Sequence, residues 1–546
     1  MKALIIDGYT DEPAAFGVPP YISPRIRALA GAFLLKRFET DYLTIDQVRS
    51  GNHWNRPNDY DFLLVYGGVT TSGRYLGGTP ISSSEISRLL EANKDPVKIV
   101  SGPLVSVGYT LRGGTTAFAP RFLGADHLFR DEFELAELLG IDYDGSRYSL
   151  LNKLYEAGAN IIVLHPSYPD VIAEIDISSG CERSDGYCSF CTESILYGGF
   201  EWRNLKGIIS EFEALRRLGV KAIRFGRSAN VIAYGYYKNS DKLDTRLIEE
   251  LFKSARHILE PEVLHIDNGN PIFIANHPVE SRSVLESIVR YNSAGDTISF
   301  GVESFDNEVR ERNNLGGSVE DIMFAIDLVN EVGGTRVDGV PKLLPGINLL
   351  YGLPGHSRNS YEVDYENLVC IRDKGLLVRR INIRQVMVFQ GAAIAKMKRP
   401  KIDHRLFENH KRRIRESVDT SMLRAVFPVG AVIPGVLPEY SDGMVHFGRP
   451  LGTYPILVGT PLSFKEKTDF VVIDHGMRSV TGLPVGTELN ELGERELQYL
   501  PGIGKDRARS LVMKRPKTVE ELVEIVGPET HKTLSLVRTK LGGKQI

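Results

Sequence analysis

Cysteine is scarce in this sequence, and long apolar runs are missing. Four cysteines among 546 residues exclude a secreted scaffold built from disulfide bonds. No apolar run approaches the ~18 residues that a membrane-spanning helix needs. The first residues, Met-Lys-Ala-Leu-Ile-Ile-Asp, reach a carboxylate after four apolar side chains, which is too soon for the core of a signal peptide. We therefore expect a cytoplasmic protein with no membrane partner.

The chain also lacks an excess of either charge. It has 66 Lys and Arg against 69 Asp and Glu, which gives a formal net charge of −3. This total by itself favours no polyanionic partner. A content of 42% hydrophobic and 25% charged residues is typical of a soluble globular protein, and the length fits three to four domains of ~150 residues.

Strand and helix patterns alternate through the first two thirds of the chain. In residues 1–160 they predict a Rossmann-like α/β domain with a parallel sheet. Residues 161–395 continue with βα units in a row, which favours a complete or partial (β/α) barrel, although a doubly wound sheet gives the same pattern. The expected strands are 172–177, 221–225, 263–266, 297–302, 347–351 and 381–388. In both folds the active groups belong on loops after the carboxyl ends of the strands.

The composition changes after residue 395. In 396–488 we expect a basic linker and a small β-rich domain, and in 489–546 a helix-hairpin-helix domain. The linker segment Lys396–Arg415 holds nine basic and two acidic residues, a local charge of +7. It fits either a solvated helix face or a path for a nucleic-acid strand. Residues 501–546 hold ten basic and five acidic residues, a local charge of +5.

Three of the four cysteines lie close together, just after the first expected barrel strand. Cys181, Cys188 and Cys191 form the pattern C-x6-C-x2-C. Thiolates at this spacing suit zinc, Cu(I) or an iron–sulfur cluster. A structural zinc ion needs four ligands, yet no other Cys or His lies within fifteen residues of these three cysteines. A catalytic zinc of the deaminase type lacks its H-x-E motif. Unligated cysteines are a further alternative, but the pattern favours an iron–sulfur cluster with one iron not held by cysteine.

The chain resembles the radical S-adenosylmethionine (radical SAM) superfamily, whose three cysteines follow the first strand of a partial (β/α)6 barrel. Phe190, just before the last cysteine, matches the family pattern, whereas the first cysteine gap is three residues longer than the usual C-x3-C-x2-C. Ser299–Phe305 and Gly346–Gly355 resemble the fourth- and fifth-strand motifs of coproporphyrinogen oxidase-like and methylthiotransferase-like members. The whole layout is most similar to uncharacterised archaeal radical SAM proteins with a C-terminal helix-hairpin-helix.

The resemblance implies cofactors and roles for individual residues. Cys181, Cys188 and Cys191 would ligate a [4Fe-4S] cluster, and S-adenosylmethionine (SAM) would chelate the fourth iron. A donor such as ferredoxin or flavodoxin would supply the electron. Further contacts with SAM would come from the aromatic Phe190 and from residues at the ends of strands: Gly226, Arg227, Ser228, Asp267, Glu303 and Asn348.

The tail contains a glycine turn, Leu500-Pro-Gly-Ile-Gly504, that resembles a helix-hairpin-helix. Gly502 and Gly504 allow a tight turn whose backbone N–H groups can meet a phosphate at the start of a helix. The basic side chains Lys505, Arg507 and Arg509 follow directly. Such a hairpin binds the backbone of RNA or DNA without reading bases. A protein-contact or purely structural hairpin is the alternative.

Two properties of related enzymes find no match in this chain. No cysteine precedes Cys181, so the second cluster of methylthiotransferases has no ligands there. The N-terminal domain resembles cobalamin-binding domains, but the string Asp46–Gly51 has Val48 where the D-x-H-x-x-G motif has its histidine. Cobalamin without an axial histidine is left open.

Three functions remain in view. The first is a radical SAM enzyme that modifies a nucleic-acid base, most plausibly in RNA. The second is a radical SAM enzyme that acts on a small molecule or peptide. The third is a DNA glycosylase-like iron–sulfur repair protein, whose cluster loop also begins C-x6-C-x2-C but needs a fourth cysteine where this chain has Tyr197.

Overall fold

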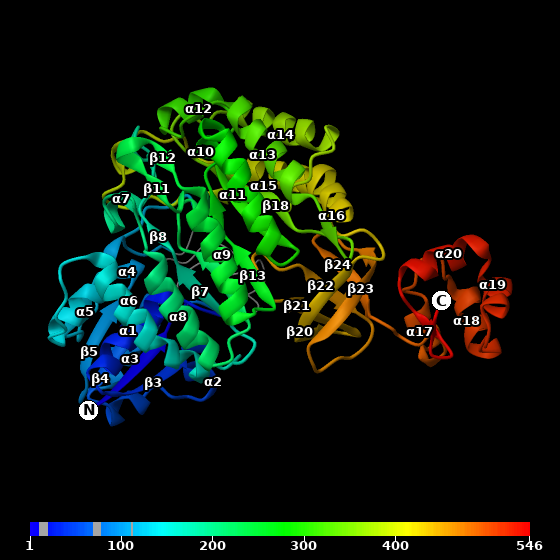
Figure 1. Cartoon of the computed structure of the whole chain (residues 1–546), viewed down its shortest axis with the longest axis horizontal. Helices are drawn as coiled ribbons and strands as arrows, with labels where there is room; N and C mark the ends of the chain where they lie inside the picture. The colour runs from blue at the N-terminus through cyan, green and yellow to red at the C-terminus, as the bar shows by residue number, and fades with distance from the viewer. Residues whose placement is uncertain (10–19, 69–77, 111–112) are drawn as a thin grey trace.

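The computed structural model describes residues 1–9, 20–68, 78–110 and 113–546. Figure 1 shows, in chain order, a parallel sheet, a curved arrangement of strands and helices, a small β barrel and a helical tail. The predicted α/β class with a partial barrel is confirmed. Among the described residues, no helix is both long enough and apolar enough to cross a membrane.

The N-terminal sheet has five parallel strands in the order β3-β1-β4-β5-β6. Its strands are β1 (Lys2–Asp7), β3 (Glu39–Thr44), β4 (Phe62–Tyr66), β5 (Val97–Ser101) and β6 (His127–Phe129). This is the flavodoxin-like order of a doubly wound fold, in which ligands bind outside the carboxyl ends of the strands. Helix α1 (Pro24–Leu35) begins as its sequence predicts, because the Ser23 side chain caps it and proline occupies its first turn.

The second region is an open barrel of parallel strands. Two linked sheets, β7-β10-β13 and β14-β15-β18-β19, follow one another, since a single residue separates β13 from β14. The strands are β7 (Ile172–Asp176), β10 (Ala222–Gly226), β13 (Val263–Ile266), β14 (Asn268–Gly269), β15 (Asp296–Glu303), β18 (Leu343–Tyr351) and β19 (Arg380–Gln385). Helices cover the outside: α8 (Leu205–Arg217), α9 (Thr245–Leu259), α11 (Pro278–Tyr291), α13 (Val319–Gly333) and α14 (Arg358–Asp373).

The N-terminal sheet and the barrel share one hydrophobic core. The short strand β2 (Tyr21–Ile22) comes from the N-terminal region but pairs with β7 of the barrel. Helix α1 packs on α6 (Arg147–Gly158), which in turn packs on α8 of the barrel. The domain boundary expected near residue 160 therefore lies inside continuous packing, and as a division of the chain it stays a prediction.

The C-terminal third contains a closed β barrel and a helical tail. The barrel strands are β20 (Val432–Asp442), β21 (Val445–Pro450), β22 (Leu457–Thr460), β23 (Thr468–His475) and β24 (Ser479–Pro484). The tail helices are α17 (Glu494–Leu497), α18 (Lys505–Lys514), α19 (Val519–Val526) and α20 (Pro528–Leu536). Their apolar side chains form one cluster with Val471, Ile473 and Leu483 of the β barrel.

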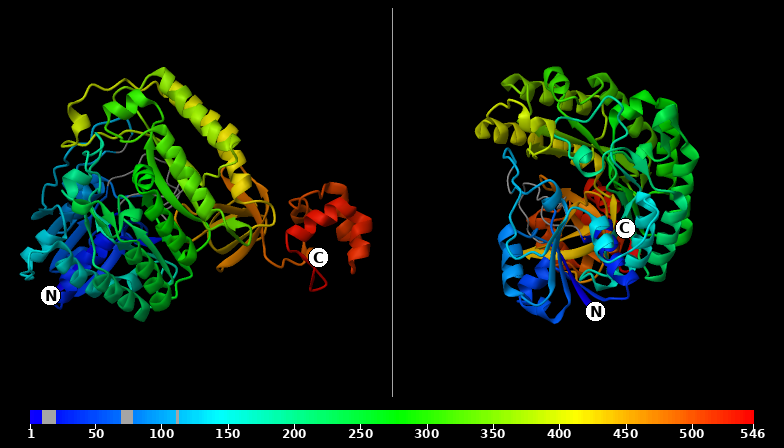
Figure 2. Two further views of the ribbon diagram at one scale, coloured as in Figure 1. Left: turned by 45° about the horizontal axis from the view of Figure 1, so that its top comes forward. Right: turned by 90° about the vertical axis from the view of Figure 1, so that its left-hand side faces the viewer.

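Most of the basic segment Lys396–Arg415 belongs to a long helix. Helix α15 (His404–Ile414) passes through a π-helical turn, Arg415–Asp419, into α16 (Thr420–Val426). Figure 2 shows this helix running from the parallel-stranded barrel toward the β barrel, with the tail beyond it. The linker thus spans the distance between the two barrels.

A buried histidine joins the two barrels. His265 of β13 accepts a hydrogen bond at Nδ1 from the Thr453 backbone N–H at 2.9 Å, and the Thr453 hydroxyl donates to the Ile266 carbonyl at 2.6 Å. Burial lowers the pKa of His265 to about 3, and nearby arginines oppose its protonation further. The imidazole is therefore neutral in the folded protein at ordinary pH.

We expect this contact to make the protein acid-sensitive. Below its ordinary pKa of 6.5, His265 binds a proton in the unfolded chain but not in the folded one. Its contribution is therefore fully present above pH 6.5 and is lost as the pH falls, by up to about 1.4 kcal/mol per pH unit. His265→Gln should flatten the dependence of the unfolding free energy on pH between 6.5 and 4.5, measured by urea denaturation. His257→Gln, on the exposed face of α9, is the control; equal slopes in both variants contradict the assignment.

Candidate functional site

The three clustered cysteines lie on a loop that the backbone closes tightly. Strand β8 (Ser178–Ser179) before the loop pairs with β9 (Glu201–Trp202) after it. Gly180 takes a positive φ of 74°, and a Cβ there would lie 2.1 Å from the Gly199 carbonyl oxygen. Only glycine fits this approach. Cys181 thus lies at the start of a closed loop, a few residues after the first strand of the barrel.

Hydrogen-bond donors point at the sulfur atoms of the loop. The Arg183 guanidinium lies 3.2 Å from Cys188 Sγ, and the Glu193 backbone N–H lies 3.4 Å from Cys191 Sγ. Burial raises the pKa of all three thiols, to about 12 for Cys191. The charges of Cys188 and Cys191 raise the pKa of Cys181 further, so the three sulfurs interact.

The loop is fixed on both sides by polar side chains. Glu182 is buried, and its Oε1 accepts from Asn230 at 2.9 Å and from Asn270 at 2.8 Å. Ser189 donates its hydroxyl to Asn313 at 2.7 Å. Phe190 packs against an apolar cluster formed by the loops that follow β15, β18 and β19. These contacts hold the cysteines while leaving each of them partly exposed.

Such a loop suits an iron–sulfur cluster. Thiolates are the ligands of these clusters, and hydrogen bonds to sulfur tune their potential. Ligation requires deprotonated thiols, so an electropositive metal centre would offset the rise in pKa that burial causes. In the part of the chain that the structure describes, no three His, Cys, Asp or Glu side chains are placed to hold a single metal ion.

The end of β10 is built around a buried carboxylate. Glu174 of β7 accepts from Arg224 at 2.5 Å and from Arg227 at 3.2 Å. Burial favours a high pKa for Glu174, but these two arginines bring it below its ordinary value. A Cβ on Gly226 would lie 2.2 Å from Glu174 Oε1, and Arg227 has a positive φ of 62°. Strain of this kind persists where the surrounding structure imposes it, often at functional sites.

A second strained residue ends β15. Glu303 also has a φ of 62°, and burial raises its pKa to about 8 against the opposing charges of Arg384 and Arg310. Its charge in turn raises the pKa of Cys188 and Cys191. Ser228, after β10, is buried and its hydroxyl has no hydrogen-bond partner among the described residues.

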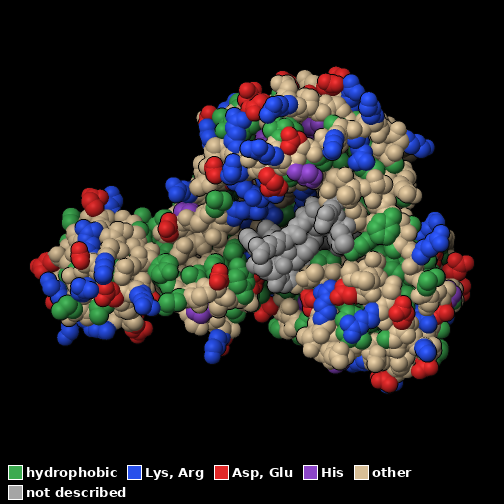
Figure 3. Space-filling view, turned by 180° about the vertical axis from the view of Figure 1, so that it is seen from behind, with side chains coloured by type: hydrophobic (Ala, Val, Ile, Leu, Met, Phe, Trp, Pro, Cys, Tyr) green, Lys and Arg blue, Asp and Glu red, His purple; other side chains and the backbone are tan. Residues whose placement is uncertain are grey.

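A cavity of about 550 Å³ opens between the carboxyl ends of the two parallel sheets. Arg227, Ser228 and Asp267 line it from the barrel, together with Glu193 from the cysteine loop. Tyr66, Pro103, Ser106, Arg130 and Asp131 line it from the N-terminal sheet. Figure 3 shows Lys and Arg side chains gathered on the upper part of the face seen from behind.

The remaining predicted contacts are placed differently. Gly226 and Glu303 flank the site without lining this cavity, and Asn348 accepts a hydrogen bond from Asn382 on the neighbouring strand at 2.8 Å. The string Asp46–Gly51 forms helix α2 (Ile45–Ser50) and its C-terminal cap, with Val48 buried in the core.

Several polar residues of the site are not among the predicted ones. Glu174 and Glu182 are buried, and the Arg25 guanidinium donates to the hydroxyl of Tyr197 at 2.6 Å beside the cavity. The sequence does contain a signal for Glu174, which is an acidic residue inside the apolar strand Ile-Ala-Glu-Ile-Asp. Because an unpaired charge is costly to bury, such a residue indicates a buried partner. Tyr197 also occupies the position of the fourth cysteine that a glycosylase cluster needs.

The predicted hairpin of the tail is a glycine turn between α17 and α18. Gly502 has a φ of 77°, and Gly504 precedes α18 without a side-chain cap. Arg507 is exposed, and its guanidinium donates to the Gly502 carbonyl at 2.7 Å and to the Thr530 hydroxyl at 3.1 Å. Arg509 lies 3.8 Å from Glu494, and Lys505 is exposed.

Comparison with known proteins identifies relatives of this chain. The Radical SAM superfamily profile matches residues 175–367. An uncharacterized protein of Methanocaldococcus jannaschii is 38% identical over 504 residues, which cover 88% of this chain and 93% of the relative. One from Archaeoglobus fulgidus is 34% identical over an alignment of 558 positions that covers 100% of both chains.

More distant relatives have names that state an activity. The tRNA-2-methylthio-N(6)-dimethylallyladenosine synthase of Buchnera aphidicola is 26% identical over 189 residues, 34% of this chain and 39% of the relative. Among solved structures, the radical S-adenosylmethionine methyltransferase TsrM of Kitasatospora setae is 12% identical, with a TM-score of 0.47 over 81% of this chain and 79% of that chain.

The closed cysteine loop gives a test with a matched control. Gly180 and Gly198 both have a positive φ, of 74° and 75°, but a Cβ on Gly198 meets no atom within 4 Å. Gly198→Ala should cost about 1 kcal/mol of unfolding free energy, the penalty of an alanine in this backbone region. Gly180→Ala should cost more and open the loop, so that its cysteines react faster with a thiol reagent. Equal thiol reactivity in the two variants contradicts this account of the loop.

Proposed function

The chain belongs to the radical SAM superfamily, and from this premise we propose that it is an enzyme that modifies a base in a nucleic acid, with RNA as the substrate. Its cofactors as a member are a [4Fe-4S] cluster and SAM. We infer that Cys181, Cys188 and Cys191 hold the cluster. When bound, these cofactors supply the one-electron cleavage of SAM that yields a 5′-deoxyadenosyl radical.

The residues of this chain would position the reactants and keep water out. We assign Arg227, Ser228 and Asp267 to the SAM side of the cavity, because they line it next to the cysteine loop. The unpartnered hydroxyl of Ser228 is free to accept or donate one hydrogen bond there. Arg183, which donates to Cys188 Sγ, would favour the charge that a reduced cluster carries. Phe190, Gly226, Glu303 and Asn348 stay predictions as SAM contacts.

The observation that carries the nucleic-acid substrate is the tail. The helix α18 begins at a glycine with no side-chain cap, so its first backbone N–H groups and the exposed Lys505 are available to a phosphate. A second uncapped turn at Gly527 precedes α20, and Arg507 links it to the first through Thr530. The relative from Buchnera is named for a tRNA nucleoside, which favours RNA over DNA.

A small-molecule or peptide substrate is the second candidate. The cavity of about 550 Å³ has the size of a pocket for such a ligand, which is the observation in its favour. In both cases the radical chemistry needs an electron donor, and we propose a ferredoxin or flavodoxin for this role. A cobalamin in the N-terminal region is compatible with both candidates.

We expect Cys188→Ala to abolish the formation of 5′-deoxyadenosine in a reconstituted, reduced sample given SAM. The fourth cysteine provides the control, because Cys370 is exposed on α14, away from the loop. Cys370→Ala should retain full iron content and full SAM cleavage, and circular dichroism should find both variants folded. A Cys188→Ala protein that cleaves SAM as well as the wild type means that the ligand assignment is wrong.

The tail should supply part of the affinity for RNA. The double variant Lys505→Gln/Arg509→Gln should bind tRNA more weakly in fluorescence anisotropy. The dependence of log K on log salt concentration should become shallower by about 0.7 to 0.9 for each lost phosphate contact. Lys206→Gln/Arg216→Gln removes the same charge from the exposed side of α8 and should leave binding unchanged. Identical salt dependence in the two double variants counts against the tail as an RNA-binding element.

An experiment in cells tests which nucleoside is the substrate. We expect the nucleosides of total tRNA or ribosomal RNA to lose one modified species when the gene is deleted. Complementation with the wild type should restore it and the Cys188→Ala variant should not. An unchanged set of nucleosides, with SAM cleavage intact in vitro, favours the small-molecule candidate.

A further inference from the structure

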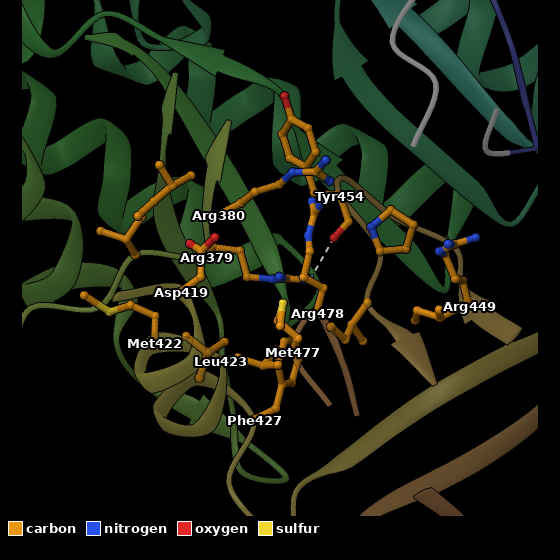
Figure 4. Close-up of a pocket in the computed structure, with 16 residues that line it drawn as sticks. Arg379, Arg380, Asp419, Met422, Leu423, Phe427, Arg449, Tyr454, Met477 and Arg478 are labelled. Atoms are coloured by element: carbon orange, nitrogen blue, oxygen red, sulfur yellow. Dashed lines mark hydrogen bonds between the residues drawn. The ribbon is translucent and has the colours of Figure 1, made fainter. Parts of the chain in front are cut away.

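A pocket of about 80 Å³, separate from the cavity beside the cysteines, lies between the two barrels. Its walls come from the start of β19, from α16 with the π-helical turn before it, and from the loops of the β barrel that hold Tyr454 and Arg478. Figure 4 shows Arg379, Arg380 and Arg478 close together in this pocket, with Asp419 at one side. No role assigned so far uses these residues.

The pocket gathers positive charge without matching negative charge. Four arginines line it, and Asp419 is the only acidic residue among the lining side chains. Arg449 is neutralised by Glu439. Arg379, Arg380 and Arg478 form no ion pair with any residue in the described part of the chain. Three guanidinium groups thus share one small space with a single carboxylate.

These arginines are held in place by neutral groups. Arg379 donates to the Tyr454 carbonyl at 2.7 Å and stacks on Phe427 at 4.7 Å. Arg380 donates to Asn382 at 2.7 Å and lies over the ring of Tyr454 at 4.8 Å. The buried Nε of Arg379 has no hydrogen-bond partner among the described residues. The contacts orient the guanidinium planes, and Asp419 is the one acidic residue of the pocket lining that favours the charges of Arg380 and Arg478.

The backbone around the pocket is also unusual. Tyr454 has a positive φ of 50°, which is rare for an aromatic residue. Asp419 ends the π-helical turn that interrupts the long linker helix. Both features are over-represented at functional sites. Tyr454 provides the carbonyl oxygen that accepts from Arg379, and Asp419 provides the single carboxylate of the pocket.

The electrostatics agree with a site that lacks its counter-charge. Burial, with the charge of Arg380, lowers the pKa of Arg379 to about 9, and burial lowers that of Arg380 to about 10. Burial also raises the pKa of Asp419 to about 6, even though Arg478, Arg415 and Arg380 oppose the rise. Every group in the cluster is thus less stable in its charged form than it is in water.

We propose that this pocket binds a phosphate group of the substrate, a proposal that rests on the radical SAM function above. A tetrahedral dianion fits a space of this size and can accept charge-assisted hydrogen bonds from several planar guanidinium groups at once. Arg380, Asn382 and Arg384 alternate along β19 and share one face of the strand. Arg384 acts on Glu303 beside the cysteines, roughly 13 Å along the strand from Arg380. A phosphate held here would anchor a substrate whose reacting part lies at the cysteine end.

The test uses the full-length protein and the variant Arg478→Gln. Arg478 forms no hydrogen bond or ion pair with another described residue, and the acidic group that its charge favours is Asp419. Arg216→Gln, exposed on α8, is the matched control. In the first arm, thermal unfolding is followed with inorganic phosphate or pyrophosphate, and chloride keeps the ionic strength constant. Phosphate should raise the melting temperature of the wild type and of the control but not that of Arg478→Gln, which should be at least as stable as the wild type without ligand.

The second arm measures tRNA binding at several salt concentrations. Arg478→Gln should weaken binding and reduce the salt slope by about 0.7, as expected for one lost phosphate contact on a single strand. If the wild type responds to phosphate through Arg478 but binds no RNA, the pocket proposal stands with a free phosphate compound as its source, and the nucleic-acid function fails. If RNA binds and Arg478→Gln matches the wild type in both arms, the pocket proposal is overturned while the nucleic-acid function stands.

Discussion

The whole arrangement depends on a buried ionic network between the N-terminal region and the barrel. Arg27 of α1 and Arg203, just before α8, both bind Glu211 of α8, and all three side chains are fully buried. Arg203 also donates to Asn152 of α6 at 2.6 Å. Such a network contributes little net stability, but any displacement leaves a charge unpaired in the core. It therefore ties α1 and α6 of the N-terminal region to α8 of the barrel.

The position of the site follows from this connection between the N-terminal region and the barrel. Both sheets direct the carboxyl ends of their strands, where loops can vary without disturbing the core, toward one cavity. The barrel contributes the cysteine loop and the strained residues Arg227 and Glu303, whose left-handed backbone is stable only because the strands before them are locked. The N-terminal region forms the other wall of this cavity.

How much of this the sequence predicts depends on the range of the interaction. Strands such as Val263–Ile266 and the start of α1 at Ser23 are local patterns, and both are found where the sequence predicts them. The cysteine spacing is also local. The role of Glu174 is not a local pattern, because it depends on Arg224 and Arg227, some 50 residues away in the sequence. Only the parallel register of β7 and β10 brings these arginines next to Glu174. The contact of Arg507 with Thr530 is of the same kind, because Thr530 belongs to another turn of the tail.

The distribution of charge adds a last constraint. A net charge of −3 conceals arginines of two kinds. Those of the Glu174 and Glu211 networks form ion pairs, two arginines to each carboxylate, and link separate elements of the fold. Arg379, Arg380 and Arg478 are assembled from segments about 100 residues apart and have no such counterpart in the described structure. They line a pocket between the two barrels, and in our proposal an extended anionic substrate that reaches both the cysteine loop and the tail would pass there.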